Sequence, residues 1–258
     1  METLTFTFGD SGENHVGMEI IGDQVKIGSG FNYSDFIKAQ EKLKDYKTEL
    51  YNLSDLIDQP DKQTNKQIDE AYLLVVRNFL SEKEASLVYE ENTKYEWDSK
   101  YFCTRRKKVL NKHARRNVMF ADNAQIPDYE NKKGTIIAWK DVPTLFTIRD
   151  RLPNYFSDKA SNLICEGNRY YDIRKTGIGY HGDTERRKVI GLRIGATIPL
   201  KFKWWHRNKS IGKLLELDLN NGDLYLMSEK CTGNDWKRSS IKTIRHSAGC
   251  AKYTTIKK

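Results

Sequence analysis

The second half of the chain is a succession of short apolar runs, and this pattern constrains the fold more than any other feature. Each run is rich in aliphatic, β-branched or aromatic residues and is bounded by glycine, asparagine or another turn-forming residue, as strands are. The runs span residues 163–171, 177–181, 189–198, 214–219, 223–227, 243–246 and 253–256. Such a series predicts that the chain ends in a β-sandwich or barrel.

Helical patterns precede these strands. The amphipathic spacing predicts helices over residues 34–57 and 142–156, and Ser81 is a typical cap for a third helix that ends near Lys94. Strand patterns occupy residues 71–79 and 1–8, and in the latter Leu4, Phe6 and Phe8 alternate with polar residues. Helices followed by many short strands indicate an α+β protein.

The composition of the 258-residue chain changes near residue 70. Residues 1–70 contain 7 Lys/Arg and 14 Asp/Glu, a net charge of −7, and the remainder contains 37 and 21, a net charge of +16. A polar stretch at residues 59–65 has the composition of a linker. We therefore predict an acidic N-terminal appendage over residues 1–70, with no role assigned, and one folded domain over residues 71–258.

Targeting signals and cysteine spacing bear on the compartment. The chain has no run of eighteen apolar residues and no basic segment before an apolar run at its start, which argues against a membrane span and a secretory signal. Its four cysteines are far apart and form no C-x-x-C pair, so neither a disulfide framework nor a zinc ribbon is indicated. We expect an intracellular protein, in the cytoplasm or nucleus of a host cell, that is not secreted.

Residues 105–116 form the densest basic stretch, with seven Lys/Arg and no acidic residue. A polyanion such as DNA or RNA is one natural partner for such a stretch. A solvated, lysine-rich face is the alternative, and charge alone does not decide between them.

Three residues in the C-terminal region have the pattern of a metal site. His181 and Asp183 lie two apart at the end of a predicted strand, so their side chains leave the same face. His246 ends another predicted strand about sixty residues later. Two histidines and one carboxylate form the facial triad of non-haem Fe(II) oxygenases, which leaves positions open for a chelating cosubstrate and oxygen. The alternative for each residue is an ordinary polar strand end.

A longer pattern surrounds these residues. Asn168-Arg169-Tyr170 precedes His181-Gly182-Asp183-Thr184-Glu185, and the segments at residues 189–196 and 222–227 follow in order. Upstream, residues 78–85 and 115–122 match as well. Over roughly residues 71–258 the chain resembles the AlkB-type dioxygenases that depend on 2-oxoglutarate and Fe(II). The resemblance implies a double-stranded β-helix core, of the jelly-roll or cupin kind, with flanking helices.

The resemblance also implies roles for single residues. His181, Asp183 and His246 would bind Fe(II), and Asn168 and Tyr170 would bind the cosubstrate 2-oxoglutarate, with oxygen as co-reactant and ascorbate as the reductant in vitro. Relatives end in a strand with the pattern R-x-N-x-T-x-R, but this chain has no arginine after His246. A buried carboxylate requires a cation. We expect Arg193, and next Lys257, to bind the far carboxylate.

The spacing before the last ligand is a second departure from the family. Relatives have the distal histidine soon after a tryptophan, whereas nine residues separate Trp236 from His246. We interpret this as a short insertion and not as loss of the site. Such departures argue against a housekeeping repair enzyme and fit a divergent branch, such as a viral or phage one.

Substrate residues follow from the same resemblance. Glu185 matches an acidic residue that contacts the target base, Phe120 matches an aromatic residue that flanks it, and Arg115 lies in the nucleotide-recognition segment. Stacking combined with an acceptor for an exocyclic amine would suit a nucleobase. The alternatives are a surface salt bridge for Glu185 and a core position for Phe120.

The resulting hypothesis is a dioxygenase that hydroxylates a nucleobase in DNA or RNA, in repair or in modification. Hydroxylation of an N-methyl group releases formaldehyde and the free base, whereas hydroxylation of a C5-methyl group leaves an alcohol. Two alternatives remain open: a protein hydroxylase of the prolyl type, and a non-catalytic nucleic-acid-binding protein on a degenerate oxygenase fold.

Overall fold

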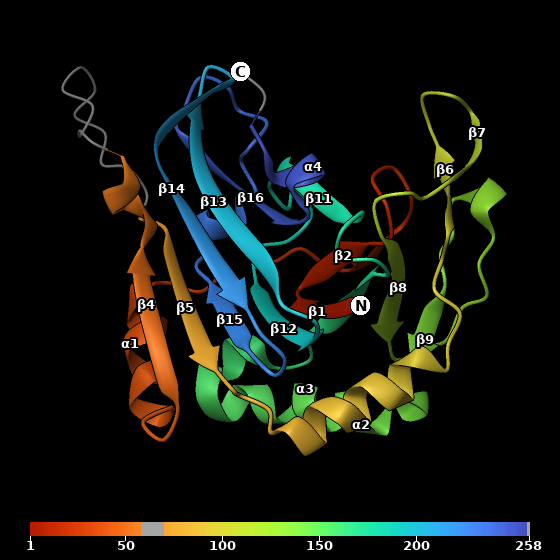
Figure 1. Ribbon diagram of the computed structural model, residues 1–258, viewed down its shortest axis with the longest axis horizontal. Coiled ribbons are helices and arrows are strands. Elements are labelled where there is room, and N and C mark those ends of the chain that lie inside the picture. The colour runs from red at the N-terminus through yellow and green to blue at the C-terminus, as the bar shows by residue number, and fades with distance from the viewer. Residues whose placement is uncertain (58–69, 257–258) are drawn as a thin grey trace.

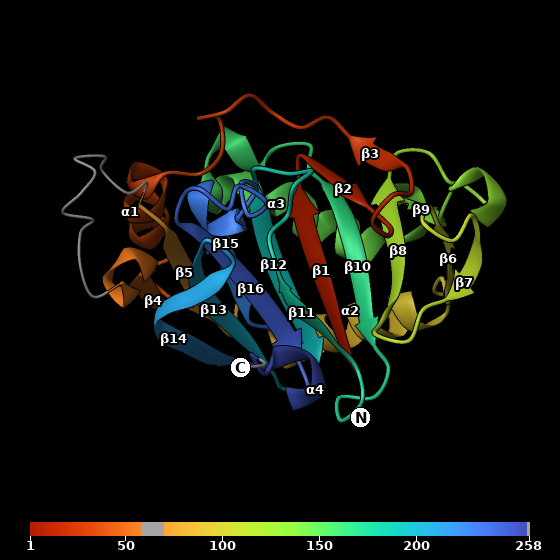
Figure 2. The same cartoon turned by 90° about the horizontal axis from the view of Figure 1, so that it is seen from above.

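The computed structural model describes residues 1–57 and 70–256, which form two facing β-sheets with helices against the larger one (Figures 1 and 2). The larger sheet has the strand order β4 (Lys47–Asn52), β5 (Tyr72–Arg77), β15 (Leu224–Met227), β12 (Val189–Gly195), β1 (Thr3–Gly9), β10 (Ile164–Tyr170), β8 (Arg116–Ala121) and β9 (Ile136–Ala138). The smaller sheet has the order β11 (Gly177–His181), β16 (Thr243–Gly249), β13 (Ile198–His206) and β14 (Lys209–Leu219). Neighbouring strands are antiparallel, except that β8 and β9 are parallel.

Two hairpins, four α-helices and five short 3-10 helices complete the described part of the chain. The hairpins pair β2 (Ser11–Glu13) with β3 (Ile20–Gly22) and β6 (Lys100–Cys103) with β7 (Lys108–Asn111). The helices are α1 (Tyr33–Lys42), α2 (Glu82–Thr93), α3 (Pro143–Phe156) and α4 (Ala251–Thr254). None of these helices has the length and apolarity that crossing a bilayer requires.

The starts of α2 and α3 agree with the sequence predictions. Ser81 and Glu84 form a reciprocal capping box at the start of α2, with each side chain accepting from the other's backbone N–H. Helix α3 begins at Pro143, and the Glu91 carboxylate of α2 accepts from the next two backbone N–H groups. These contacts satisfy donors that a helix N-terminus leaves free and join the two helices.

Side chains of the larger sheet alternate between two buried faces. In β1, Leu4, Phe6 and Phe8 pack in the core that contains helices α1, α2 and α3. The threonines between them point toward the smaller sheet, and Thr5 and Thr7 line a cavity there. A second core, which includes Leu200, Phe202 and Trp204, fills the rest of the space between the sheets. The result is a sheet-rich α+β fold, as predicted, in which two facing sheets and a layer of helices are consistent with a jelly roll and do not form a barrel.

The predicted boundary at residue 70 does not separate two units. Strand β1 lies between β10 and β12, in the middle of the larger sheet, and β4 pairs with β5 (Figure 2). Residues 1–57 are therefore part of the domain and not an appendage. The predicted linker at residues 59–65 lies outside the described residues.

Two predicted elements are wrong. The expected helix over residues 34–57 ends at Lys42 and is capped by Asn32, and the chain then forms β4. Strand β4 pairs with the edge of β5. The hydrogen bonds and packing of this pairing outweigh the weak helical preference of residues 47–52. The expected strand at residues 253–256 is also absent, because α4 occupies the first half of that segment.

The central place of β1 predicts a large loss of stability when its core contacts are removed. Phe6 is fully buried, and its ring centre lies 5.8 Å from that of Phe120 and 6.4 Å from that of Trp97. We expect Phe6→Ala to lower the free energy of unfolding by about 3–5 kcal/mol in urea denaturation. Val16→Ala, at a position 72% exposed, is the matched control from the same segment. An appendage would instead give a Phe6 variant as stable as the wild type.

Candidate metal centre and cavity

The three predicted metal ligands come together at one edge of the smaller sheet. His181 at the end of β11 is paired in register with His246 on β16, and Asp183 follows two residues after His181. The Nε2 atoms of the two histidines lie 3.5 and 3.6 Å from Oδ1 of Asp183. The ligand atoms all lie within 4.8 Å of one another, so the three side chains could hold one metal ion.

Hydrogen bonds and burial prepare these groups for a cation. Nδ1 of His181 is 2.8 Å from the Gly179 carbonyl oxygen, which can only accept, so Nε2 keeps its lone pair for the site. Burial lowers the pKa of His181 to about 3, so its imidazole is neutral at pH 7. Burial alone would raise the pKa of Asp183, but His246 and Arg186 hold it below its usual range. Neutral imidazole and ionised carboxylate are the forms that bind a metal.

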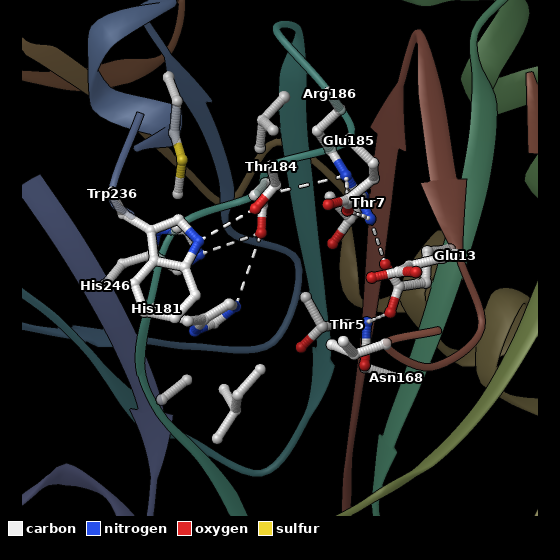
Figure 3. Close-up of a pocket in the computed structure, with 18 of the residues that line it drawn as sticks. Thr5, Thr7, Glu13, Asn168, His181, Thr184, Glu185, Arg186, Trp236 and His246 are labelled. Carbon is white, nitrogen blue, oxygen red and sulfur yellow. Dashed lines mark hydrogen bonds and ion pairs between the residues drawn. The ribbon is translucent and has the colours of Figure 1, made fainter. Parts of the chain in front are cut away.

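A cavity of about 1010 Å³ opens beside the metal ligands, between the two sheets (Figure 3). The inward-facing residues of β1, β10, β12 and β15 form its floor. Of the residues that sequence analysis assigned to a site, the following line this cavity: Arg115, Asn168, Tyr170, His181, Asp183, Glu185, Arg193 and His246.

Arg193 is a buried cation without a protein partner for two of its donor atoms. Only 1% of the residue is exposed, and neither Nε nor Nη1 makes a hydrogen bond. Tyr170 and Tyr225 are its neighbours, and the Tyr225 ring crosses β12 over Gly191, where a Cβ would lie 1.9 Å from the ring. Burial lowers the pKa of Arg193. Unpaired buried donors are costly, so this part of the cavity is built for an anion.

The hydroxyl of Thr5 is a third donor without a partner. Thr5 is 5% exposed, its Oγ1 makes no hydrogen bond, and β1 places it opposite both Asn168 and Arg193. Sequence analysis missed Thr5 because it assigned no role to the first seventy residues.

Asn168 is held by neighbouring side chains. Its Oδ1 accepts hydrogen bonds from Nε of Arg115 and, at 2.6 Å, from Nδ2 of Asn117. Its own Nδ2 donates to Glu166 at 3.2 Å. These bonds fix the side chain of Asn168 in the cavity wall. Its contact with a cosubstrate stays a prediction.

Acidic residues gather at the outer end of the cavity. Arg186 is buried and donates to Glu185, at 2.7 and 2.9 Å, and to Glu166. Glu13 of β2 faces the same group, and burial together with the negative charge of Glu185 raises the pKa of Glu13 to about 7 (Figure 3). Glu13 comes from the segment that we expected to lie outside the domain.

The raised pKa of Glu13 predicts a pH-dependent stability. The folded chain binds one more proton than the unfolded chain between the ordinary pKa of 4.5 and about 7. The stabilisation is thus complete below pH 4.5 and is lost as the pH rises through about 7. We expect Glu13→Gln to melt at a higher temperature than the wild type at pH 8 and at a similar temperature at pH 5. Glu130→Gln, at an exposed position outside the cavity, should show no such divergence.

Comparison with known proteins finds a relative over nearly the whole chain. No protein-family model matches it. Uncharacterized protein R156 of Acanthamoeba polyphaga mimivirus is 39% identical over 255 residues, which cover 98% of this chain and 97% of the relative. The chain belongs to the same family as this viral protein. The shared region includes β1 and the cavity wall as well as the metal-ligand segments, because it spans nearly the full length. The relative is uncharacterized, so a functional assignment rests on the site itself.

One predicted site residue, Phe120, does not line the cavity. Phe120 is fully buried among Phe6, Trp97 and Trp139 on the helix side of the larger sheet, so it cannot flank a base. Gly167 on the neighbouring strand β10 faces the same core, where a Cβ would lie 2.9 Å from the Phe120 ring. Lys257 lies outside the described residues.

The basic stretch at residues 105–116 divides into two parts. Residues 105–108 are exposed at the tip of the β6–β7 hairpin, which projects from the body of the protein (Figure 1). Lys112 is instead buried, hydrogen-bonds Asn14 and Asn117, and has its pKa lowered to about 7 by burial. Within this stretch, the hairpin tip is the part that presents a cluster of exposed cations.

Proposed function

We propose that this protein is an Fe(II)- and 2-oxoglutarate-dependent dioxygenase of AlkB type that oxidises a nucleobase in DNA or RNA. One observation carries the proposal: the unpartnered cation Arg193 and the His181–Asp183–His246 group line the same cavity. A metal ion and a buried cation are the two features that would bind the ends of a 2-oxo dicarboxylate.

The fold supports this class. The metal ligands lie on the smaller sheet, the cation lies on the larger sheet, and the cavity separates them. Such facing sheets fit the double-stranded β-helix that the resemblance implies. Fe(II) bound with 2-oxoglutarate and oxygen supplies the oxidation of a substrate C–H bond, with succinate and CO₂ as the other products.

The protein's own residues bind and orient. His181, Asp183 and His246 would hold the metal ion, and Arg193 would pair with the far carboxylate of 2-oxoglutarate. Thr5 would donate a further hydrogen bond, because its hydroxyl faces the cavity opposite Arg193 and has no other acceptor. In the AlkB-type dioxygenases, a strand after the distal histidine supplies the residues that bind the far carboxylate. Here, strand β1 from the start of the chain lies between β10, which carries Asn168 and Tyr170, and β12, which carries Arg193.

Two features support a nucleic-acid substrate. Glu185 and Glu13 offer carboxylate acceptors at the outer end of the cavity, as the amine edge of a base requires. The exposed cations at residues 105–108 would contact phosphates next to the base.

Succinate formation tests the proposal. Purified protein with Fe(II), ascorbate and 2-oxoglutarate should form succinate, and single-stranded oligonucleotides with N-methylated or C5-methylated bases should increase the rate of succinate formation. Mass spectrometry should show loss of the N-methyl group from the first kind of oligonucleotide and addition of one oxygen to the second. Proline-containing peptides are the comparison substrate. Oxidation of peptides but not oligonucleotides would identify a protein hydroxylase instead, and no succinate from folded, iron-loaded protein with any substrate would contradict the oxygenase class.

A further inference from the structure

Trp236 and Tyr180 are partly exposed aromatic residues of the cavity beside the metal ligands. Tyr170 and Tyr225 are buried in the cavity floor, and Tyr180 packs against Trp205 with 6.1 Å between ring centres. Trp236 lies in the segment of residues 228–242 that joins β15 to β16, and it lines the cavity next to the exposed Lys237. Because Phe120 lies in the core, Trp236 is the tryptophan of the cavity on which a planar ring could stack.

The position of Trp236 is set first by the metal-ligand segment. Its Nε1 donates to Oγ1 of Thr184 at 3.1 Å, a bond visible in Figure 3 beside His181 and His246. Gly182, between the two ligands of that segment, allows the close approach. A Cβ on Gly182 would lie 2.8 Å from Cδ1 of Trp236 and 2.0 Å from the Gly233 carbonyl oxygen. The indole therefore packs against the segment that carries His181 and Asp183.

Arg245 holds Trp236 from the other direction. Its guanidinium carbon lies 5.0 Å from the ring centre of Trp236 and 4.5 Å from that of Trp205, within the range of a cation–π contact. Its Nη2 also donates to the Trp236 carbonyl oxygen at 3.4 Å. Because Arg245 precedes the ligand His246 in β16, the indole and the metal ligand are positioned by the same strand.

We infer that Trp236 is a specificity-determining residue that stacks on a planar, unsaturated ring and presents it to the metal centre, with Thr184 and Arg245 as positioning residues. The inference rests on the proposed nucleobase substrate and names the contact that selects it. A tryptophan clamped by a hydrogen bond and by a guanidinium loses little freedom when a base stacks on it. Exposed Lys237, with Nζ 5.9 Å from the Trp236 ring centre, lies where a phosphate of the stacked nucleotide would be contacted.

Fluorescence of 2-aminopurine tests this contact without any turnover. Metal-free protein is titrated with a single-stranded oligothymidine that contains one 2-aminopurine, and stacking quenches the probe. We expect Trp236→Leu to weaken binding about tenfold and to abolish the quenching, and Trp236→Phe to retain most of both. The same oligonucleotide with an abasic residue in place of the probe should bind wild-type protein about as weakly as the intact one binds Trp236→Leu.

Control variants separate stacking from general damage. Tyr33→Leu removes a half-exposed aromatic ring on α1, away from the cavity, and should bind like the wild type. Thr184→Val should weaken binding and quenching severalfold, whereas Thr184→Ser, which keeps the hydroxyl, should restore them. A purely structural role for Thr184 would not depend on the hydroxyl in this way.

The outcomes distinguish this inference from the proposed function. Quenching that requires Trp236, in a protein that forms no succinate, would overturn the oxygenase assignment but support the stacking contact. Succinate formation together with equal quenching by wild type and Trp236→Leu would overturn the stacking contact alone. Absence of quenching in the wild type, with oxidation of proline peptides, would overturn the stacking contact and the nucleobase substrate together.

Discussion

Replacing Asp183 with alanine is expected to lower the affinity for a divalent metal by about 100-fold or more and to remove succinate formation. Asp183 is the only carboxylate of the described ligand group, and its Oδ1 is the atom that both histidine Nε2 atoms approach. Even changes outside the ligand shell cost about 10–100-fold in metal affinity, so loss of a ligand should cost at least as much. Anaerobic calorimetry with Mn(II), which does not turn over, measures the affinity directly.

The control for this variant is His113→Ala. His113 is exposed and lies outside the cavity, so its loss should leave Mn(II) affinity and succinate formation at wild-type levels. If Asp183→Ala bound Mn(II) as tightly as the wild type, the three side chains would not form the metal site.

Replacing Arg193 with methionine is expected to act in opposite directions on stability and on cosubstrate binding. Without ligand, the variant should be more stable by about 1–4 kcal/mol, because a buried cation with unpaired donors gives way to an apolar side chain of similar length. Binding of 2-oxoglutarate should weaken about 100-fold, because the far carboxylate loses a charge-assisted partner in a buried site. Thermal melts with and without the inert dicarboxylate glutarate, and the KM for 2-oxoglutarate, measure the two effects.

Arg149→Met is the matched control for Arg193→Met. Arg149 is also a buried arginine with an unpartnered Nε, but it packs on Trp139 and Phe146 in the helix layer and does not line the cavity. Its replacement should not change the KM for 2-oxoglutarate or the shift of the melting temperature by glutarate. Equal stabilisation by glutarate in wild type and Arg193→Met would show that the carboxylate binds elsewhere.

Much of the candidate metal centre could be predicted from the sequence because its geometry is local. The two-residue spacing of His181 and Asp183 at a strand end places both side chains on one face whatever the strand pairs with. The capping box at Ser81 and the alternation of Leu4, Phe6 and Phe8 are likewise properties of a few neighbouring residues.

The wrong prediction that Phe120 flanks a base has a physical cause. The larger sheet is buried on both faces, by helices on one side and by the smaller sheet on the other. An apolar residue in such a strand therefore gives no sign of which face it occupies. The sequence pattern shows that Phe120 is buried, and only the packing shows that it points away from the cavity.

By itself, the sequence determined the strand-rich α+β character, the capping box of α2 and the His-x-Asp pair, because each depends on residues close together in the chain. Tertiary structure alone decided that β1 lies between β10 and β12, that Glu13 and Thr5 line the cavity and that Arg193 lacks a partner. These features depend on pairings between residues about 150 or more positions apart, such as Thr5 with Asn168 and Arg193. No local pattern encodes such a choice, because it follows from the shared burial of both faces of the sheet.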